Sequence, residues 1–324
     1  MTTEPGALEA AAAPHLPQPA SAAAVWGALV TVYIVWGSTY LGIAVLVQSM
    51  PPQLFMGLRF VLAGLVMATV LAVVKGPSVL RVTRRELASA GVVGALLLGI
   101  GMGNLTLAER YVPSGVAALI VAVVPLWAVL LRVATGDRPA ALTWLGVVVG
   151  LVGTAVLVAP GSTAGVGGAT STQTTLWSGL IVVGTMAWAL GSFLAPRLPT
   201  PGNPFVLSAY EMLLGGGVLV VLGTVRGERL TSESLGAVTT ASWWAFGYLV
   251  VVGSLFAFTA YVWVLDHAPL SLVMTYAYVN PVVAVALGAL VLDEPVTTGV
   301  LVGGAIVVIG VLLVVSAERL RPSR

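Results

Sequence analysis

The sequence contains no cysteine and few charged residues, and both shortages narrow what the protein can be. Without cysteine it can form neither a disulfide framework nor a thiolate metal site. Charged residues make up 8% of the chain, whereas a soluble domain has about 25%. Hydrophobic residues make up 58% of the 324 residues. A globular protein of this composition could not cover its surface with polar groups, so we expect an integral membrane protein.

Side chains suited to catalysis are also scarce. The one lysine, Lys75, follows no glycine-rich phosphate loop, which argues against ATP hydrolysis by this chain. His15 and His267 are the two histidines, too few for a histidine metal site or a catalytic triad. We therefore expect no enzyme, no metal, no cofactor and no nucleic-acid partner.

Apolar runs of about 20 residues recur from Val25 onward, each long enough to cross a hydrocarbon core of about 30 Å. They predict an all-α integral membrane protein with ten transmembrane helices. The predicted spans are 25–47, 53–74, 88–108, 112–132, 141–159, 175–195, 204–225, 242–265, 269–291 and 296–316. Residues 1–24 are rich in Ala and Pro and lack the basic start of a secretory signal. They are expected to form a disordered cytoplasmic tail, and residues 317–324 a second cytoplasmic tail.

The cationic residues predict how the spans are oriented. If the N-terminus is cytoplasmic, the inner segments hold ten Lys and Arg residues, and the outer loops hold Arg110, Arg226 and Arg229. Because positive charge accumulates on the cytoplasmic side, both termini are expected there. The predicted location is the plasma (inner) membrane, crossed many times.

Landmark residues of the first half recur in the second half at offsets of 152 to 157 positions. The matched pairs are Trp36 with Trp188, Arg59 with Glu211, Pro113 with Pro269, Pro125 with Pro281, Gly146 with Gly303 and Gly153 with Gly310. They predict a first repeat over 25–160, a linker over 161–174 and a second repeat over 175–316. Since five spans is an odd number, the second copy enters the membrane upside down. Inverted repeats of this kind are typical of secondary transporters.

Arg59 and Glu211 are the only ionised side chains well inside the predicted spans. A charge there costs about 2.5–3.5 kcal/mol, so both should face the protein interior. The span limits separate them by about 10 Å along the membrane normal, at about 1.5 Å per residue, so a direct ion pair is not expected. Three interpretations stay open: Glu211 couples proton movement to transport, Arg59 holds a carboxylate substrate, or both make structural contacts.

The third span ends in small and polar residues. Gly99 and Gly103 form a GxxxG motif, which lets another helix approach closely, and Asn104 follows within the same turn. This pattern favours a helix that lines a passage. Glu109 closes the span, either as part of a charged interfacial turn with Arg110 or as a coupling or gating residue.

Two tryptophans lie in the middle of spans, too deep for the interfacial aromatic belt. Trp36 is followed by Ser38 and Tyr40, and Trp188 is followed by Ser192. An indole N–H at this depth needs a partner or a polar ligand. Packing alone could explain either tryptophan, but the two together favour residues that line a cavity.

The ninth span carries polar groups around a proline. Tyr276 and Asn280 are four residues apart and share a helix face, whereas Tyr278 points elsewhere. Pro281 cannot donate to the carbonyl one turn earlier, so the helix can bend there, and Pro125 has the same effect in the first half. Matched bends favour gating, and the alternative is a static kink.

At these residues the sequence resembles the EamA family of the drug/metabolite transporter superfamily, most closely its YedA-like branch, over residues 25–316. The stretches that carry the resemblance are Trp36–Tyr40, Pro51–Pro52, Arg59–Phe60, Gly103–Asn104, Ala108–Glu109, Pro113–Gly115, Ala117–Ala118, Pro125, Gly191–Ser192, Glu211–Met212, Gly253–Ser254 and Thr275–Pro281. The resemblance implies ten helices in two inverted five-helix repeats, and an inner-membrane carrier that exports amino acids, related metabolites or drugs. In one departure, Arg138 stands where the second half has Glu294, so a carboxylate role there cannot hold for both halves.

The expected function is therefore a secondary exporter of small metabolites that works by alternating access, with proton antiport as one energy source. An uncoupled facilitator or importer of the same substrates is the first alternative, and a non-transporting membrane scaffold is the second. The expected partners are the small-molecule substrate and the lipid bilayer. A homodimer stays open.

Overall fold

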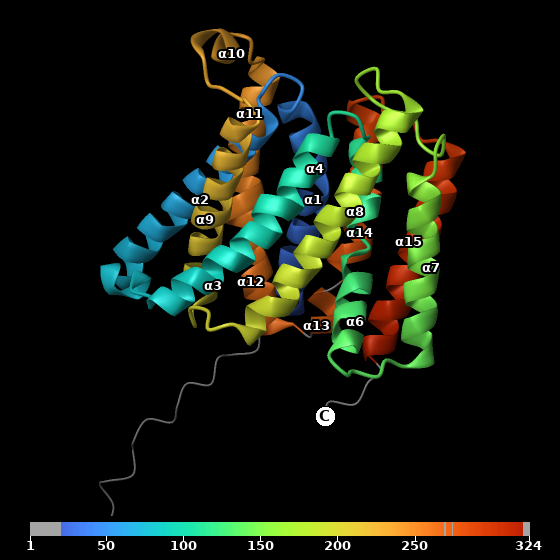
Figure 1. Ribbon diagram of the computed structural model, residues 1–324. Helices are drawn as coiled ribbons and strands as arrows, with labels where there is room; N and C mark the ends of the chain where they lie inside the picture. The colour runs from blue at the N-terminus through green and yellow to red at the C-terminus, as the bar shows by residue number, and fades with distance from the viewer. Residues whose placement is uncertain (1–20, 269, 274, 320–324) are drawn as a thin grey trace, which may run out of the picture.

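The computed structural model describes residues 21–268, 270–273 and 275–319, and the expectations for the chain outside these ranges, including His15, are not addressed by it. All regular structure in this part of the chain is helical (Figure 1). Nine helical segments there are long and apolar enough to cross a membrane, and Tyr276–Val291 is a shorter apolar helix of 16 residues. The expectation of an all-α membrane protein is confirmed, with nine to ten candidate spans.

The first half contains five spanning segments. They are α1 (Ala22–Leu46), α2 (Pro52–Lys75), α3 (Arg84–Gly94) continued by η2 (Ala95–Met102) and α4 (Gly103–Ala108), α5 (Ser114–Val121) followed by α6 (Val124–Ala134), and α7 (Ala141–Val158). A short 3-10 turn, η1 (Pro77–Leu80), precedes α3.

The second half repeats this order. It contains α8 (Ser171–Leu194) with η3 (Ala195–Arg197), α9 (Pro204–Val225), α11 (Thr240–Tyr248) continued by η4 (Leu249–Phe256) and α12 (Ala257–His267), α13 (Leu270–Val273) followed by α14 (Tyr276–Val291), and α15 (Thr298–Arg319). The short helix α10 (Ser232–Gly236) lies in the loop before α11.

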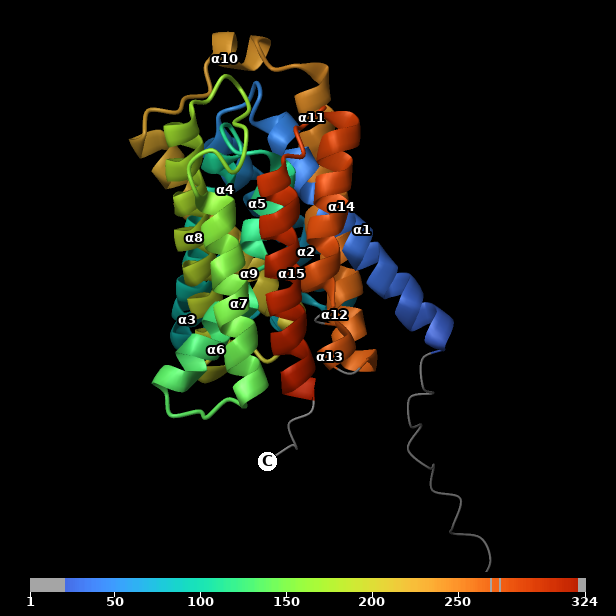
Figure 2. The same cartoon turned by 90° about the vertical axis from the view of Figure 1, so that its right-hand side faces the viewer.

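The two halves run in opposite directions through the bundle. Helix α1 begins, and α15 ends, at the same end, which we call the terminal end, whereas α8 begins at the opposite end (Figures 1 and 2). We call that opposite end the distal end. It carries the loops 47–51, 109–113, 159–170, 226–239 and 292–297.

Two helix pairs join the halves through glycine. Helix α2 packs along α9, and α7 packs along α15. A methyl group added at Gly57 would lie 2.7 Å from the carbonyl oxygen of Gly216, so the two backbones are in direct contact. At the second crossing, a methyl group at Gly146 would lie 2.8 Å from the Gly310 carbonyl oxygen. Such close approach through small residues is how helices associate in membranes, where burial of apolar surface gives no driving force.

The third helix of each half contains an eight-residue π-helical stretch at a matched position, η2 in the first half and η4 in the second. In η2, Gly99 packs on Val218 of α9, and Gly101 packs on Trp188 of α8. The close helix approach expected from the glycine pattern is thus confirmed. π-helical turns often occur at functional sites, and η4 supports one side chain of the site described below.

The proline-containing helices are not interrupted at matched places, contrary to the expectation of paired bends. In the first half the chain leaves the helix at residues 122–123, and Pro125 then sits in the first turn of α6, where its missing N–H costs nothing. In the second half α14 begins at Tyr276, and Pro281 lies inside it. The sequence spacing of the prolines matches, but their positions within the helices differ.

Adjacent glycines on α9 provide a test of the glycine crossings. A methyl group at Gly216 would lie 2.9 Å from the Gly57 carbonyl oxygen and the Val61 nitrogen, whereas one at Gly217 would meet nothing within 4 Å. We expect Gly216→Ala to lower the free energy of unfolding by about 1–3 kcal/mol through overpacking. Reversible unfolding in mixed micelles, followed by circular dichroism, measures this. Gly217→Ala is the control, and equal destabilisation by both variants would contradict the close crossing.

Candidate functional site

An aromatic cluster joins helices of both halves. Trp36 of α1 lies against Tyr261 of α12 and Tyr276 of α14, with ring centroids 4.9 and 5.3 Å away. Tyr261 and Tyr276 meet edge to face at 5.8 Å. Edge-to-face rings of this kind attract one another through their quadrupoles. The structure thus brings the predicted Trp36 and Tyr276 together and adds Tyr261, for which the sequence carried no spacing signal.

Polar side chains next to this cluster link α1 to the second half. Asn280 is buried, and its amide nitrogen, in the orientation that satisfies its surroundings, donates to the backbone oxygens of Tyr33 and Tyr276 at 3.3 and 3.2 Å. A second polar contact joins α1 to α11, where the hydroxyls of Ser38 and Tyr248 lie 2.6 Å apart. The Asn280 amide thus binds backbone of α1 and α14, and its role in lining a pathway stays a prediction.

Arg59 is buried in α2 and is held by the π-helical stretch η4. The Ser254 hydroxyl donates to the Leu249 carbonyl five residues earlier, so its oxygen is left to accept the Arg59 Nε–H at 2.9 Å. A second guanidinium nitrogen, Nη1, contacts the Met56 sulfur at 3.3 Å. Among the described residues Arg59 forms no ion pair with Glu211, as expected from their separation.

Glu109 lies just beyond α4 and points into the protein, whereas the adjacent Arg110 is exposed. The side chain of Glu109 is 3% exposed, and neither carboxylate oxygen has a hydrogen-bond partner among the described residues. The interpretation of this pair as a charged interfacial turn is therefore wrong for Glu109 and fits Arg110.

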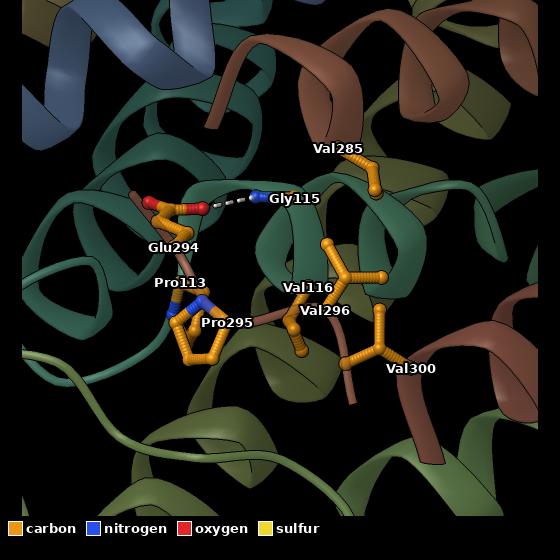
Figure 3. Close-up of a pocket in the computed structure, with 8 residues that line it drawn as sticks. All are labelled: Pro113, Gly115, Val116, Val285, Glu294, Pro295, Val296 and Val300. Carbon is orange, nitrogen blue, oxygen red and sulfur yellow. Dashed lines mark hydrogen bonds between the residues drawn. The ribbon is translucent and has the colours of Figure 1, made fainter. Parts of the chain in front are cut away.

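Two carboxylates of the second half cap helix N-termini of the first half at the distal end. Glu294, in the loop after α14, accepts from the backbone N–H of Ser114 at 2.8 Å and from the Ser114 hydroxyl at 3.0 Å. It also accepts from the backbone N–H of Gly115 at 3.3 Å (Figure 3). Glu228, in the loop after α9, accepts from the backbone N–H groups of Gln53 and Leu54 at 3.2 and 2.8 Å. Helix N-termini present unpaired N–H groups and a positive dipole end, so an anion stabilises them.

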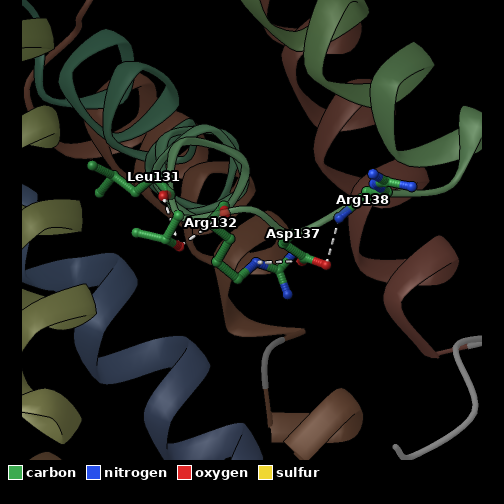
Figure 4. Close-up of polar contacts among 5 residues, drawn as sticks. Leu131, Arg132, Asp137 and Arg138 are labelled. Atoms are coloured by element: carbon green, nitrogen blue, oxygen red, sulfur yellow. Dashed lines mark hydrogen bonds and ion pairs between the residues drawn. The ribbon is translucent and has the colours of Figure 1, made fainter.

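The counterpart turn at the terminal end is built differently. There Asp137 accepts from the Arg138 backbone N–H at 2.8 Å and lies 3.8 Å from Arg132 Nε, so these contacts stay within the turn between α6 and α7 (Figure 4). Arg138 holds the position that Glu294 holds in the second half. A guanidinium has no acceptor atom and cannot cap a helix N-terminus.

The other predicted site residues lie apart from the aromatic cluster. Asn104 of α4 donates to the Leu180 carbonyl of α8 at 3.3 Å, which is a helix-to-helix contact. Trp188 packs against Gly101, and Ser192 is exposed. The matched tryptophans of the two halves therefore do not share one environment.

Comparison with known proteins agrees with this architecture. The model of the EamA-like transporter family matches residues 23–159 and again residues 175–316. The chain belongs to the EamA-like transporter family. It is a multi-pass membrane transporter and not an enzyme.

Three similar proteins illustrate how far this EamA transporter resembles known chains. It is 35% identical to the uncharacterized inner membrane transporter YedA of Escherichia coli strain K12, over 93% of each chain. It is 22% identical to the uncharacterized transporter YoaV of Bacillus subtilis strain 168, over 88% of this chain and 94% of that one. One crystal structure, 20% identical, matches 93% of this chain and its own whole length with a TM-score of 0.59, which supports the fold.

Two cavities of the EamA transporter lie away from the aromatic cluster. The cavity beside Glu294 holds about 10 Å³, enough for at most one water molecule (Figure 3). An apolar groove of about 300 Å³ runs between α2, α9 and the region of η4 and α12. It is lined by Val66, Met67, Val70, Leu71, Lys75, Phe205, Leu255 and Thr259. None of the predicted pathway residues lines this groove.

Sequence analysis missed the capping roles of Glu228 and Glu294. A signal for them existed, since Pro51–Pro52 and Pro113–Ser114 mark helix starts that need acceptors. Which acidic residue supplies the acceptor depends on loop geometry in the other half, and the local pattern does not contain it.

Removing the Glu294 charge tests the distal cap. Hydrogen bonds to a charged acceptor contribute about 1.5–3 kcal/mol, so Glu294→Gln should favour separation of α5 from its cap by about tenfold or more. The measurement is the rate at which a water-soluble maleimide labels Val116→Cys, a buried position beside the cap. Glu233→Gln, an exposed carboxylate at the same end, is the control. If both variants label at one rate, the cap does not hold this end closed.

Proposed function

We propose that this EamA transporter is a secondary exporter of small metabolites, such as amino acids or related compounds, and works by alternating access. Two five-helix halves that run in opposite directions support an inverted repeat over 25–160 and 175–316. Inverted repeats allow each half to adopt the conformation of the other, so that a central site opens to either side in turn.

The observation that carries this proposal is the way the second half closes on the first at the distal end. At the distal end, the second half closes on the first through Glu228 and Glu294. An arrangement that is fastened at one end by exchangeable hydrogen bonds fits one of two alternating states.

The orientation belongs to the proposal. Cationic residues are concentrated at the terminal end, which favours a cytoplasmic location for both termini and an external location for the distal end. The structure would then represent a state closed to the outside. The relative YedA is described as an inner membrane transporter, and we propose the same membrane for this chain.

The substrate pathway is proposed to pass the contact between α1 and α14. Trp36, Tyr261 and Tyr276 present aromatic faces there, and Ser38 and Tyr40 add hydroxyl groups on α1. A pathway of this kind suits small amphipathic molecules, because aromatic faces accept both apolar groups and cations. Asn104, Trp188 and Ser192 are kept as secondary candidates.

Two alternative functions differ from the proposed one, the first in its energy source and the second in the class of protein. An uncoupled facilitator would show the same flux with and without a pH gradient, and a scaffold would show no flux of any metabolite. Flux in everted vesicles separates them. If Glu211→Gln leaves a pH-dependent flux unchanged, Glu211 has no coupling role.

The proposed pathway predicts altered transport when its side chains are removed. A comparison of secreted metabolites from overexpressing and deleted cells identifies the substrate. We then expect Tyr276→Ala and Asn280→Ala to lower its efflux about tenfold or to change substrate preference. Val282→Ala, at an exposed position on the same helix, is the control. Unchanged efflux and preference in both pathway variants would exclude this route.

A further inference from the structure

Glu109 is a buried carboxyl group that accepts no hydrogen bond from the residues that the structure describes. It is 3% exposed, and both of its oxygens lack a hydrogen-bond partner among the described residues. An ionised carboxylate without donors is costly to bury, whereas a protonated carboxyl carries no net charge. The geometry therefore favours the protonated form in the closed state.

The charged and titratable groups around Glu109 come from three other elements. Tyr40 of α1, Arg59 of α2 and Glu294 of the loop after α14 all interact electrostatically with it. Glu294 accepts from three donors at the N-terminus of α5. Arg59 is engaged by Ser254 and Met56.

These surroundings act together on the titration of Glu109. Burial first, and the Glu294 carboxylate second, raise the pKa of Glu109 well above its usual range, while Arg59 acts in the opposite direction. Where two carboxyl groups share a site, their environments separate their proton affinities.

We propose that Glu109 is a proton-binding site whose occupation is linked to closure of the distal end. This rests on the proposed function, because it requires a state in which the distal end opens. On opening, the carboxyl meets water and its O–H bond breaks, with the proton passing to that water. On closing, the carboxylate takes a proton from a hydronium ion in the water at the distal end, so that the O–H bond forms again and a water molecule is released. No other reactant takes part.

The sign of the pH dependence follows from linkage. A carboxyl whose pKa is raised in the closed state stabilises that state fully below its open-state pKa, which is about 4.3 for glutamate. This stabilisation is lost as the pH rises through the raised pKa. Between the two values the ratio of open to closed molecules should rise up to about tenfold per pH unit.

Infrared spectroscopy in lipid nanodiscs tests the proton directly. The test uses a Glu211→Gln background, which removes the other carboxyl group inside a span. We expect the carbonyl band of a protonated carboxylic acid to persist above pH 5 in that background, to be absent when Glu109→Gln is added and to remain when Glu233→Gln is added. If the band remains when Glu109→Gln is added, or if none persists above pH 5 in the Glu211→Gln background, the proton site is not Glu109.

The link to closure is measured by maleimide labelling of Val116→Cys, normalised at each pH to an exposed distal position, Thr172→Cys. The normalised rate should rise with pH, become flat in Glu109→Gln and keep its slope in Glu109→Asp. A slope that survives in Glu109→Gln overturns the link. If the rate responds to Glu294→Gln but not to pH, this inference alone fails. If no condition changes the rate, alternating access fails as well.

Discussion

Direct backbone contact at glycine crossings is the constraint on which the rest of the structure depends. Gly57 meets Gly216 where α2 crosses α9, and Gly146 meets Gly310 where α7 crosses α15. In a membrane, close packing must supply the driving force for helix association that the hydrophobic effect supplies in water. These crossings hold two oppositely directed halves in one register, and that register brings loops of the second half over helix starts of the first.

The register of the two halves determines which carboxylates lie at helix N-termini of the distal end. Because Glu228 and Glu294 are delivered to the N-termini of α2 and α5, four backbone donors of the first half are satisfied by the second. The same closure buries Glu109 near Tyr40, Arg59 and Glu294, and no residue in the described part of the chain donates to it. Carboxylates with and without hydrogen-bond donors among the described residues thus lie at one end, and our proposal that protons act on this end rests on that difference.

Sequence reasoning predicted much of the fold because membrane burial leaves a strong signal. Long apolar runs identified the spans, and matched landmarks identified two halves, with Gly146 and Gly310 then found in contact across them. The break positions near Pro125 and Pro281 could not be predicted, because helix continuity depends on neighbours as well as on proline. The burial of Glu109 could not be predicted either. A Glu–Arg pair at the end of a span is typical of an interfacial turn, and only the structure shows which of the two side chains points into the protein.

The most direct test of the account is the distance between Arg110→Cys and Thr298→Cys, spin-labelled in lipid nanodiscs and measured by pulsed electron paramagnetic resonance. Both positions are exposed, the first in the first half and the second in the second half. Because the sequence has no native cysteine, they are the only labelling sites. The account predicts two distance populations, with the longer one growing when Glu294→Gln is introduced. A single population that is the same with and without the cap would contradict it.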